Sequence, residues 1–451
     1  MQTFWLQNWR LMLSKRSRKT VVAAILLPVL VYIGVQWYML DHLLLPSPPS
    51  RSSASGLQPL YAPGVDEKHV DIQTDNGKLT CPERRNLVFL KGMKCATSTL
   101  LGMFNRFAIK RNLSVALPMG NRIYHNWPYP MTLRDVRPTH RGVYNMILHH
   151  AVYTPAVMRA LMPADTVYIS IMRQPFSHLR SVFRYFNVAE IAGVSGFEQD
   201  HLAEYFSDVE RYERVYKSPN AQKRWCIPDG FSVTRNLMSH CHGMPLGFPV
   251  GARDISRDAA AIDAYIRQLG RSFELVMIVE HFYESLILLR RFMCWEFKDI
   301  VFVTSNVAPT QKGIPKTKTY PRHIEEFHKR WSYADYRLYD YFNSTLWSHI
   351  SRHGTGFHQE VKAFKAVQKR VEKYCLDVYS RDNQSEKLPA HTEASSKWSR
   401  RFYINAEDCR ALGPQPIKML IKMKQESEIL DKALLQEDAK SADVRKYKGL
   451  C

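Results

Sequence analysis

The chain has 451 residues, enough for one large α/β domain or two medium ones. Its formal net charge of +21 suits a nucleic acid, an anionic membrane surface or a polyanionic small ligand as partner. Zinc-finger spacing, an RNA-binding aromatic signature and a long Lys/Arg block are all missing, so we expect no nucleic acid and favour a membrane and an anionic ligand.

Residues 20–40 (TVVAAILLPVLVYIGVQWYML) carry no charge and would span about 31 Å as a helix, the thickness of a hydrocarbon core. Residues 1–19 are basic, and positive flanks stay in the cytoplasm. We therefore predict a cytoplasmic tail over 1–19, a single transmembrane signal anchor over 20–40 and a luminal remainder. A cleaved signal peptide fits less well, because the apolar run is long and no compelling cleavage site follows it.

Residues 41–80 are rich in Pro, Ser and Gly, which predicts a luminal stem. Three sequons, at Asn112, Asn343 and Asn383, are candidate N-glycosylation sites and agree with a luminal address. All eight cysteines follow the predicted anchor, where disulfides can form. We expect Cys95 to be free. Seven cysteines then remain, so at least one more is unpaired or joined to another chain.

The stretch from Asn86 to Ala108 has an anion-binding pattern. An apolar strand, Leu87–Leu90, runs into a turn with two lysines, Lys91–Lys94, and then into small and hydroxyl residues that open a helix. Backbone amides at such a helix start, with its dipole, face a phosphate-sized group. The nucleotide-triphosphatase loop is excluded because no Gly-Lys pair is followed by a hydroxyl residue. Taken alone, the stretch is equally compatible with an ordinary βα turn bearing solvated lysines.

Further along, residues 118–138 mix aromatic and polar side chains that could stack on a sugar but more often pack a loop: Tyr124, His125, Trp127 and Tyr129. Strands are predicted at Val143–Leu148, Thr166–Met172, Leu275–Val279 and Asp299–Thr304. Helices are predicted from Pro175, over Phe282–Phe292, over Ser332–Ile350 and over Gln425–Lys448. Residues 306–330 form a basic loop, either over a ligand or simply solvated. This alternation predicts an α/β fold with a central, mostly parallel sheet flanked by helices.

Ligands of such sheets bind at the carboxyl ends of the strands, where Lys91, His149 and Arg173 fall. Arg173 ends one predicted strand, and Ser181 lies two helical turns further on. A guanidinium fork and a hydroxyl can grip one phosphate from two sides. Two separate anion sites fit a donor with phosphates at both ends, such as 3′-phosphoadenosine-5′-phosphosulfate (PAPS).

These segments resemble the galactose 3-O-sulfotransferases, including those that act on galactosylceramide. FLKGMKCATSTLL is similar to their 5′-phosphosulfate loop and SIMRQPFSHLRSVFRYF to their 3′-phosphate element. The likeness continues through YNMILHH, LVMIVEHFYESLILLRRFMCWEFKDI and WSYADYRLYDYFNSTLW. It implies a P-loop-like sulfotransferase domain over 81–352 with a C-terminal helical extension over 353–451.

The resemblance also implies a single-pass type II Golgi membrane enzyme that sulfates the 3-hydroxyl of galactose on a glycolipid or glycoprotein, with PAPS as co-substrate and no metal. Lys91 and Lys94 would act on the 5′-phosphate and the bridging oxygen, with a cradle formed by Cys95, Ala96, Thr97, Ser98 and Thr99. Arg173 and Ser181 would hold the 3′-phosphate. A general base is needed, and one of His149 and His150 is our candidate.

Two departures from the family bear on function. Its loop commonly reads Lys-Thr-His-Lys, whereas this chain has Met93 in place of the histidine, and methionine cannot accept a proton. The segment after Arg235-Asn236 is also altered. It contains His240, Cys241 and His242, which are too closely spaced for one zinc ion on a regular element.

The alternatives are a glycosaminoglycan O-sulfotransferase, acting on uronyl or amino sugars, and a catalytically impaired PAPS-binding luminal protein. A luminal nucleotide kinase is disfavoured by the loop sequence. The sequence decides neither between glycolipid and glycoprotein acceptors nor whether the chain is a homo-oligomer.

Overall fold

The computed structural model describes residues 74–75, 78–139, 143–195, 201–221, 224, 226–303, 320–381, 388–412 and 420–425. The predicted tail, anchor and most of the stem lie outside these residues. So do the sequon at Asn383, most of the basic loop predicted over 306–330 and nearly all of the helix predicted over 425–448. Within the described part of the chain, we find no helix with the length and hydropathy needed to cross a bilayer.

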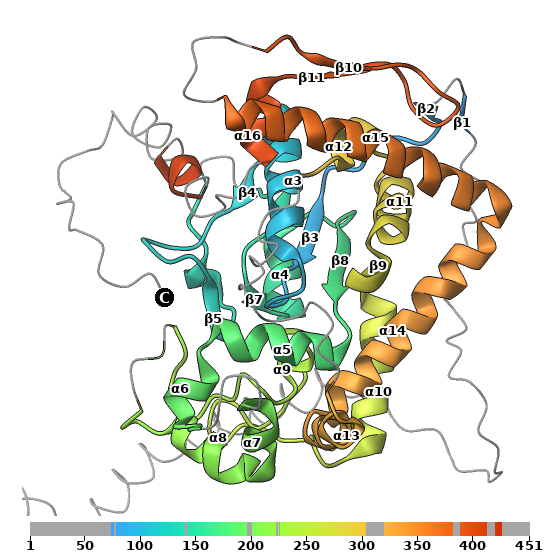
Figure 1. Cartoon of the computed structure of the whole chain (residues 1–451). Helices are drawn as coiled ribbons and strands as arrows, with labels where there is room; N and C mark the ends of the chain where they lie inside the picture. Colours follow the sequence, from blue (N-terminus) through green and yellow to red (C-terminus); the bar gives the residue numbers. More distant parts are fainter. Residues whose placement is uncertain are drawn as a thin grey trace, which may run out of the picture. The chain divides into compact units, whose positions relative to one another are not determined.

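Five parallel strands form the central sheet, in the order β4-β6-β3-β8-β9 (Figure 1). Their bounds are β3 Leu87–Leu90, β4 Val115–Ala116, β6 Met146–Ile147, β8 Val167–Met172 and β9 Leu275–Ile278. Leu87 pairs with Met146 on one side and with Val167 on the other. After β3 the chain forms β4 and β6 on one side of this strand, and then β8 and β9 on its other side. The strand order therefore reverses at β3, and ligands of α/β sheets bind beside such a reversal.

Helices flank the sheet, which confirms the predicted α/β class. The longer ones are α3 Thr97–Lys110, α5 Pro175–Tyr185, α8 Val209–Lys217, α10 Ala259–Ser272, α11 Phe282–Met293, α13 Arg322–Trp331, α14 Tyr333–Arg352 and α15 Gly354–Ser380. The shorter ones are α4 Pro155–Leu161, α6 Val188–Ala192, α7 His201–Ser207, α9 Leu237–Cys241, α12 Phe297–Ile300 and α16 Ala406–Leu412, with 3-10 turns η1 Leu133–Asp135 and η2 Val279–His281.

Three small sheets complete the described structure. The pairs are β1 Thr74–Asp75 with β2 Lys78–Leu79, β5 His125–Pro130 with β7 Ala151–Val152, and β10 His391–Glu393 with β11 Phe402–Ile404.

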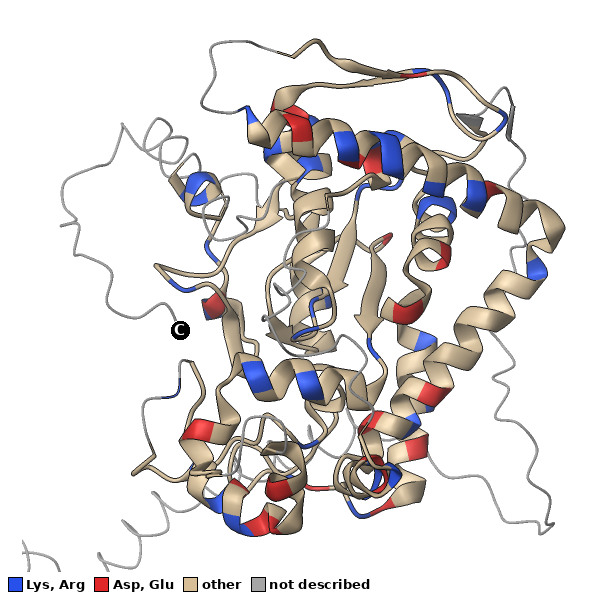
Figure 2. Ribbon diagram, in the orientation of Figure 1, with Lys and Arg blue, Asp and Glu red and all other residues tan. Residues whose placement is uncertain are grey.

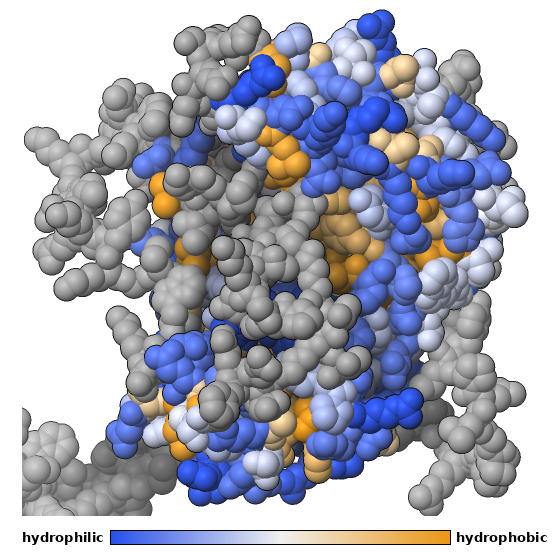
Figure 3. All heavy atoms as spheres, viewed as in Figure 1, coloured by the Kyte–Doolittle hydropathy of each residue, from blue (hydrophilic) through white to orange (hydrophobic). Residues whose placement is uncertain are grey.

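The core follows the apolar pattern of the sequence. All four residues of β3 are buried, and so are the apolar side chains of α3, among them Leu100, Leu101, Phe104 and Phe107. Phe89 meets Phe104 at 5.0 Å between ring centroids, and Phe107 stacks on Trp295 at 3.9 Å. The face seen in Figure 3 is correspondingly hydrophilic over most of its coloured area, with apolar residues in scattered patches.

Three predictions about elements need correction. Residues 299–303, the described part of a predicted strand, do not form one: Glu296 and Asp299 make a capping box that starts the short helix α12. The N–H and C=O of Phe302 then bind the side chain of Gln368 on α15, at 3.1 and 2.7 Å, instead of a neighbouring strand. The strand predicted over Val143–Leu148 is shorter. The described end of the basic loop predicted over 306–330 is largely helical, because α13 begins at Arg322.

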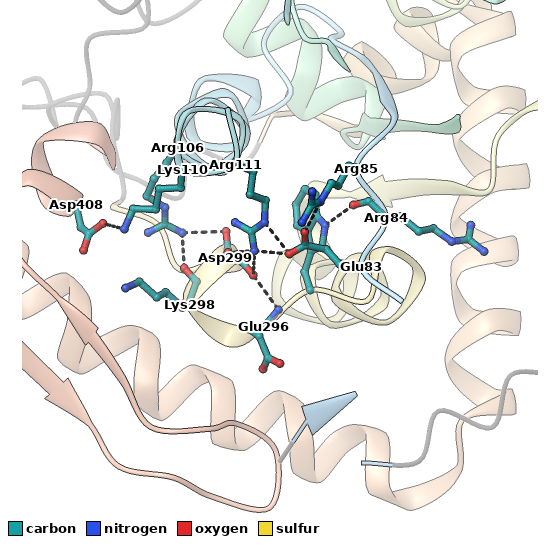
Figure 4. Close-up of polar contacts among 11 residues, drawn as sticks. Glu83, Arg84, Arg85, Arg106, Lys110, Arg111, Glu296, Lys298, Asp299 and Asp408 are labelled. Atoms are coloured by element: carbon teal, nitrogen blue, oxygen red, sulfur yellow. Dashed lines mark hydrogen bonds and ion pairs between the residues drawn. The ribbon is translucent and has the colours of Figure 1, made fainter. Parts of the chain in front are cut away.

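A charged network ties the start of the domain to α3, α12 and α16 (Figure 4). Arg111 pairs with Glu83 at 2.5 Å and with Asp299 at 3.0 Å, while Arg106 donates to the carbonyl oxygen of Asp299 at 2.9 Å. Lys110 pairs with Asp408 on α16. These contacts hold the carboxyl-terminal end of α3, so they fix the helix whose other end opens the candidate anion site.

Disulfides join Cys81 to Cys294 and Cys375 to Cys409. Cys95 is free, as predicted, and a second free cysteine is Cys241; both are buried.

Candidate active site

The turn between β3 and α3 is shaped to receive an anion. Two of its non-glycine residues adopt left-handed backbone conformations, Lys94 with φ 57° and Ala96 with φ 55°. Ala96 is the N-cap of α3 and makes no side-chain cap hydrogen bond, and the first turn carries no acidic residue. Amides at the start of a helix need acceptors, and alternating right- and left-handed residues point successive N–H groups into one concavity. The positive end of the helix dipole adds to this preference.

Three cations, two in this turn and one after the neighbouring strand β8, have no anionic partner in the described residues. Lys91 is only 7% exposed, and burial, followed by repulsion from Lys94, lowers its pKa to about 7. The pKa of Lys94 is lowered by burial and then by Arg173 and Arg184. The Nε of Arg173 is buried, and no described residue accepts a hydrogen bond from it. Uncompensated buried charges are costly unless a ligand neutralises them.

These cations come from the carboxyl ends of adjacent strands, as predicted. Lys91 follows β3, and Arg173 follows β8. Figure 2 shows basic but no acidic residues on α5, which crosses the sheet at this edge. Ser181 lies on α5 and is half-buried; none of the described contacts joins it directly to Arg173.

The predicted cradle residues lie at the start of α3, in different environments. Ala96 is exposed, and Ser98 and Thr99 are half-buried. The Thr97 hydroxyl donates to the carbonyl oxygen of Gly92 at 3.3 Å. The Cys95 thiol is fully buried and donates to the carbonyl oxygen of Met93, so burial raises its pKa and it does not offer a thiolate to a ligand.

The two candidate bases have different partners. His150 Nδ1 lies 2.8 Å from the carbonyl oxygen of Lys91. A carbonyl only accepts, so Nδ1 carries the proton and Nε2 keeps its lone pair. His149 instead packs near His125, with ring centroids 6.1 Å apart, and its buried Nε2 has no partner among the described residues. Burial is the main cause that holds the pKa of both well below the ordinary histidine value, so both imidazoles are neutral at pH 7.

A third imidazole, which the sequence did not single out, holds the same turn. His178 on α5 has Nε2 2.8 Å from the carbonyl oxygen of Met93, and burial lowers its pKa to about 4. Met93 itself is buried. The carbonyls of Lys91 and Met93 are thus each held by a neutral histidine. The only sequence signal for His178 was its place between Arg173 and Ser181.

The aromatic segment over residues 118–138 was predicted either to stack on a sugar or to pack a loop. Most of its aromatic side chains pack inside the protein. Tyr124, His125 and Trp127 are buried, and Trp127 stacks on Phe186. Tyr129 is the member that remains partly exposed.

The altered segment after Arg235-Asn236 forms α9. Asp335 on α14 accepts hydrogen bonds from the amides of Met238 and Ser239 at its start, and burial raises the pKa of this carboxyl to about 6. His240 bonds to the carbonyl oxygen of Pro128, whereas His242 bonds to Ser170 on β8, so the two imidazoles serve different parts of the fold.

The two described sequons differ in setting. Asn112 is exposed in the turn after α3. Asn343 is half-buried within α14, and its Oδ1 is shielded from solvent.

The sequence matches the family model described as Galactose-3-O-sulfotransferase over residues 5–390. Galactose-3-O-sulfotransferase 2 of Sus scrofa is 31% identical over 321 residues, which cover 69% of this chain and 73% of the relative. Galactosylceramide sulfotransferase of Homo sapiens is 28% identical over 327 residues, 70% of each chain. Galactose-3-O-sulfotransferase 3 of Mus musculus is 29% identical over 315 residues, 66% of this chain and 67% of the relative. The chain therefore belongs to the galactose-3-O-sulfotransferase family of enzymes.

Proposed function

We propose that this enzyme moves a sulfuryl group from PAPS to the 3-hydroxyl of a galactose residue on a glycolipid or glycoprotein. The observation that carries the proposal is the set of three cations, Lys91, Lys94 and Arg173, which lack anionic partners among the described residues and lie in the turn before the uncapped start of α3 or after the neighbouring strand β8. PAPS is a polyanion, with charge on its 3′-phosphate, its 5′-phosphate and its sulfate, and supplies the missing negative charge.

The two anion sites bind different ends of the donor. Lys91, Lys94 and the first amides of α3 neutralise the 5′-phosphosulfate, while Arg173 and Ser181 hold the 3′-phosphate. In-line transfer forms a bond from galactose O3 to sulfur and breaks the bond from sulfur to the bridging oxygen, whose developing charge the lysines stabilise. The proton of the 3-hydroxyl goes to a neutral imidazole. His150 is favoured over His149 because its Nε2 keeps a lone pair while its Nδ1–H is engaged beside Lys91.

Removing either phosphate-binding cation should weaken donor binding. For Lys94→Ala and Arg173→Ala we expect affinity to fall roughly ten- to hundredfold, because a charge-assisted phosphate contact contributes about 1.5–3 kcal/mol. Titration calorimetry with 3′-phosphoadenosine-5′-phosphate (PAP), the desulfated donor, measures this directly. Lys397→Ala, an exposed lysine beyond β10, is the matched control. If a folded variant keeps wild-type affinity for PAP, the residue substituted in it is not part of the donor site.

We also propose that the enzyme is a single-pass type II Golgi membrane protein anchored by residues 20–40. In sealed microsomes the chain after residue 40 should then resist added protease, and a glycosidase should increase its mobility through at least one sequon, with Asn112 the most accessible of those described. A C-terminus cut by protease in intact vesicles would contradict this topology.

The acceptor is tested with the purified luminal region, labelled PAPS and a panel of galactosides, heparan and chondroitin. The proposal predicts label on the galactosides alone. Label on heparan or chondroitin would favour a glycosaminoglycan sulfotransferase, and PAP binding without transfer to any acceptor would indicate an impaired enzyme.

A further inference from the structure

Tyr185, the last residue of α5, is an exposed aromatic side chain in contact with the candidate donor site. Its side chain is 46% exposed, and the Nζ of Lys94 lies 3.9 Å from its ring centroid. Figure 1 shows α5 running across the sheet at the carboxyl ends of β3 and β8. The Tyr185 ring therefore presents an aromatic surface open to solvent beside the lysine assigned to the transferring group.

A row of aromatic rings connects Tyr185 to the candidate base, His150. The Tyr124 ring packs edge-on against the His150 ring, with centroids 5.3 Å apart. Tyr124 in turn meets Trp127 at 5.6 Å, Trp127 stacks on Phe186 at 6.4 Å, and Phe186 meets Tyr185 at 4.9 Å between ring centroids. The donor lysine thus contacts one end of this row of rings and the candidate base the other. On the proposed function, the reacting hydroxyl of the acceptor lies near both.

Other exposed aromatic residues in the described ranges have unrelated neighbours. Tyr129 meets Phe248, Phe327 meets His323, Trp347 meets His281, and Tyr403 lies under Arg401. Of the exposed aromatic side chains in the described ranges, Tyr185 is the one that contacts the β3–α3 turn.

We propose that Tyr185 is the residue on which the acceptor galactose stacks, so that it determines specificity for the sugar and positions the 3-hydroxyl for transfer. The axial 4-hydroxyl of galactose leaves the hydrogens on C3, C4 and C5 together on one face, and this apolar face packs on an aromatic ring while the hydroxyl edge stays free to hydrogen-bond. This inference rests on the proposed function and adds the acceptor subsite to it.

Tyr185→Ala should raise the KM for a simple acceptor, methyl β-lactoside, about tenfold, because it removes the ring that the sugar packs on. The dissociation constant for PAP should change by less than about threefold, since Tyr185 donates nothing to the phosphates. Tyr185→Phe keeps the ring and should recover most of the lost affinity for acceptor. This separation of acceptor KM from donor affinity, with recovery by phenylalanine, is not what a purely structural residue would give.

Tyr403→Ala is the matched control. Tyr403 is 48% exposed, has the guanidinium of Arg401 5.3 Å from its ring centroid and lies on β11, well away from α5 in Figure 1. Its acceptor KM should equal that of the wild type. An unchanged acceptor KM in Tyr185→Ala, or an equal loss of PAP affinity, would overturn the inference.

Failure of the inference can be told apart from failure of the proposed function. If the wild type transfers label to galactosides but Tyr185→Ala keeps its KM, only the subsite is wrong. If the wild type transfers to no galactoside, the proposed function fails, and saturation-transfer NMR with methyl β-lactoside on the PAP complex still decides the subsite. Wild-type binding that is lost in Tyr185→Ala would support it, and equal signals from both proteins, or none from the wild type, would contradict it.

Discussion

His150→Ala should lower turnover roughly a hundredfold or more while PAP binding stays intact, the scale expected for a missing general base. The reason lies in one hydrogen bond: His150 Nδ1 donates to the carbonyl oxygen of Lys91 at 2.8 Å, which fixes the tautomer and leaves Nε2 able to accept a proton beside the donor turn. Burial keeps the imidazole neutral, so no proton must be removed from it before the reaction. Single-turnover kinetics with labelled PAPS measure the chemical step.

His149→Ala is the internal control, because His149 packs toward His125 and not against the Lys91 carbonyl. We expect it to affect mainly stability. Near-normal turnover in both variants would place the base elsewhere. A large gain in activity from Met93→His would show that the enzyme works without an optimal base.

Glu360→Gln should destabilise the fold by about 3–5 kcal/mol, because it leaves two guanidinium groups without their counter-charge. Glu360 on α15 is buried and pairs with Arg290, which is fully buried, and with Arg291 at 2.6 Å, both on α11. Arg290 also donates to the carbonyl oxygen of Trp398 at 2.7 Å, so the same cluster anchors the chain between β10 and β11. Chemical denaturation followed by tryptophan fluorescence gives the free energy of unfolding.

The comparison for this variant is Glu284→Gln. Glu284 pairs with Lys365 at 3.2 Å between the same two helices, but the lysine is about half exposed. Exposed pairs contribute about 1 kcal/mol or less. If both variants lose the same small amount, the buried cluster does not hold α15 against α11.

Strands and helices with a clean apolar pattern were predictable. The strands β3, β8 and β9 and the helices α3, α5 and α11 lie where the sequence placed them, because local pattern and tertiary burial agree there. The apolar run at Ile300–Val303 carries the same local signal as a strand. The backbone of Phe302 instead hydrogen-bonds to the side chain of Gln368. Local sequence patterns do not reveal a contact between residues so far apart in the chain.

The candidate site was predictable only in part from the sequence. Lys91 and Arg173 could be placed together from the rule that parallel strands share one carboxyl edge. The different partners of His149 and His150 could not be predicted, because they depend on which ring reaches the Lys91 carbonyl after the chain turns past β6. His178 and Tyr185 contribute through tertiary contacts with the β3–α3 turn, which a helical pattern does not reveal.

The position of the sulfate on the product tests the central claim most directly. The purified enzyme, given PAPS and methyl β-lactoside, should yield one product whose proton spectrum shows the downfield shift at H3 of the terminal galactose and at no other position. A sulfate on O6, on the glucose residue or on an amino sugar acceptor instead would contradict the assignment of this chain as a galactose 3-O-sulfotransferase.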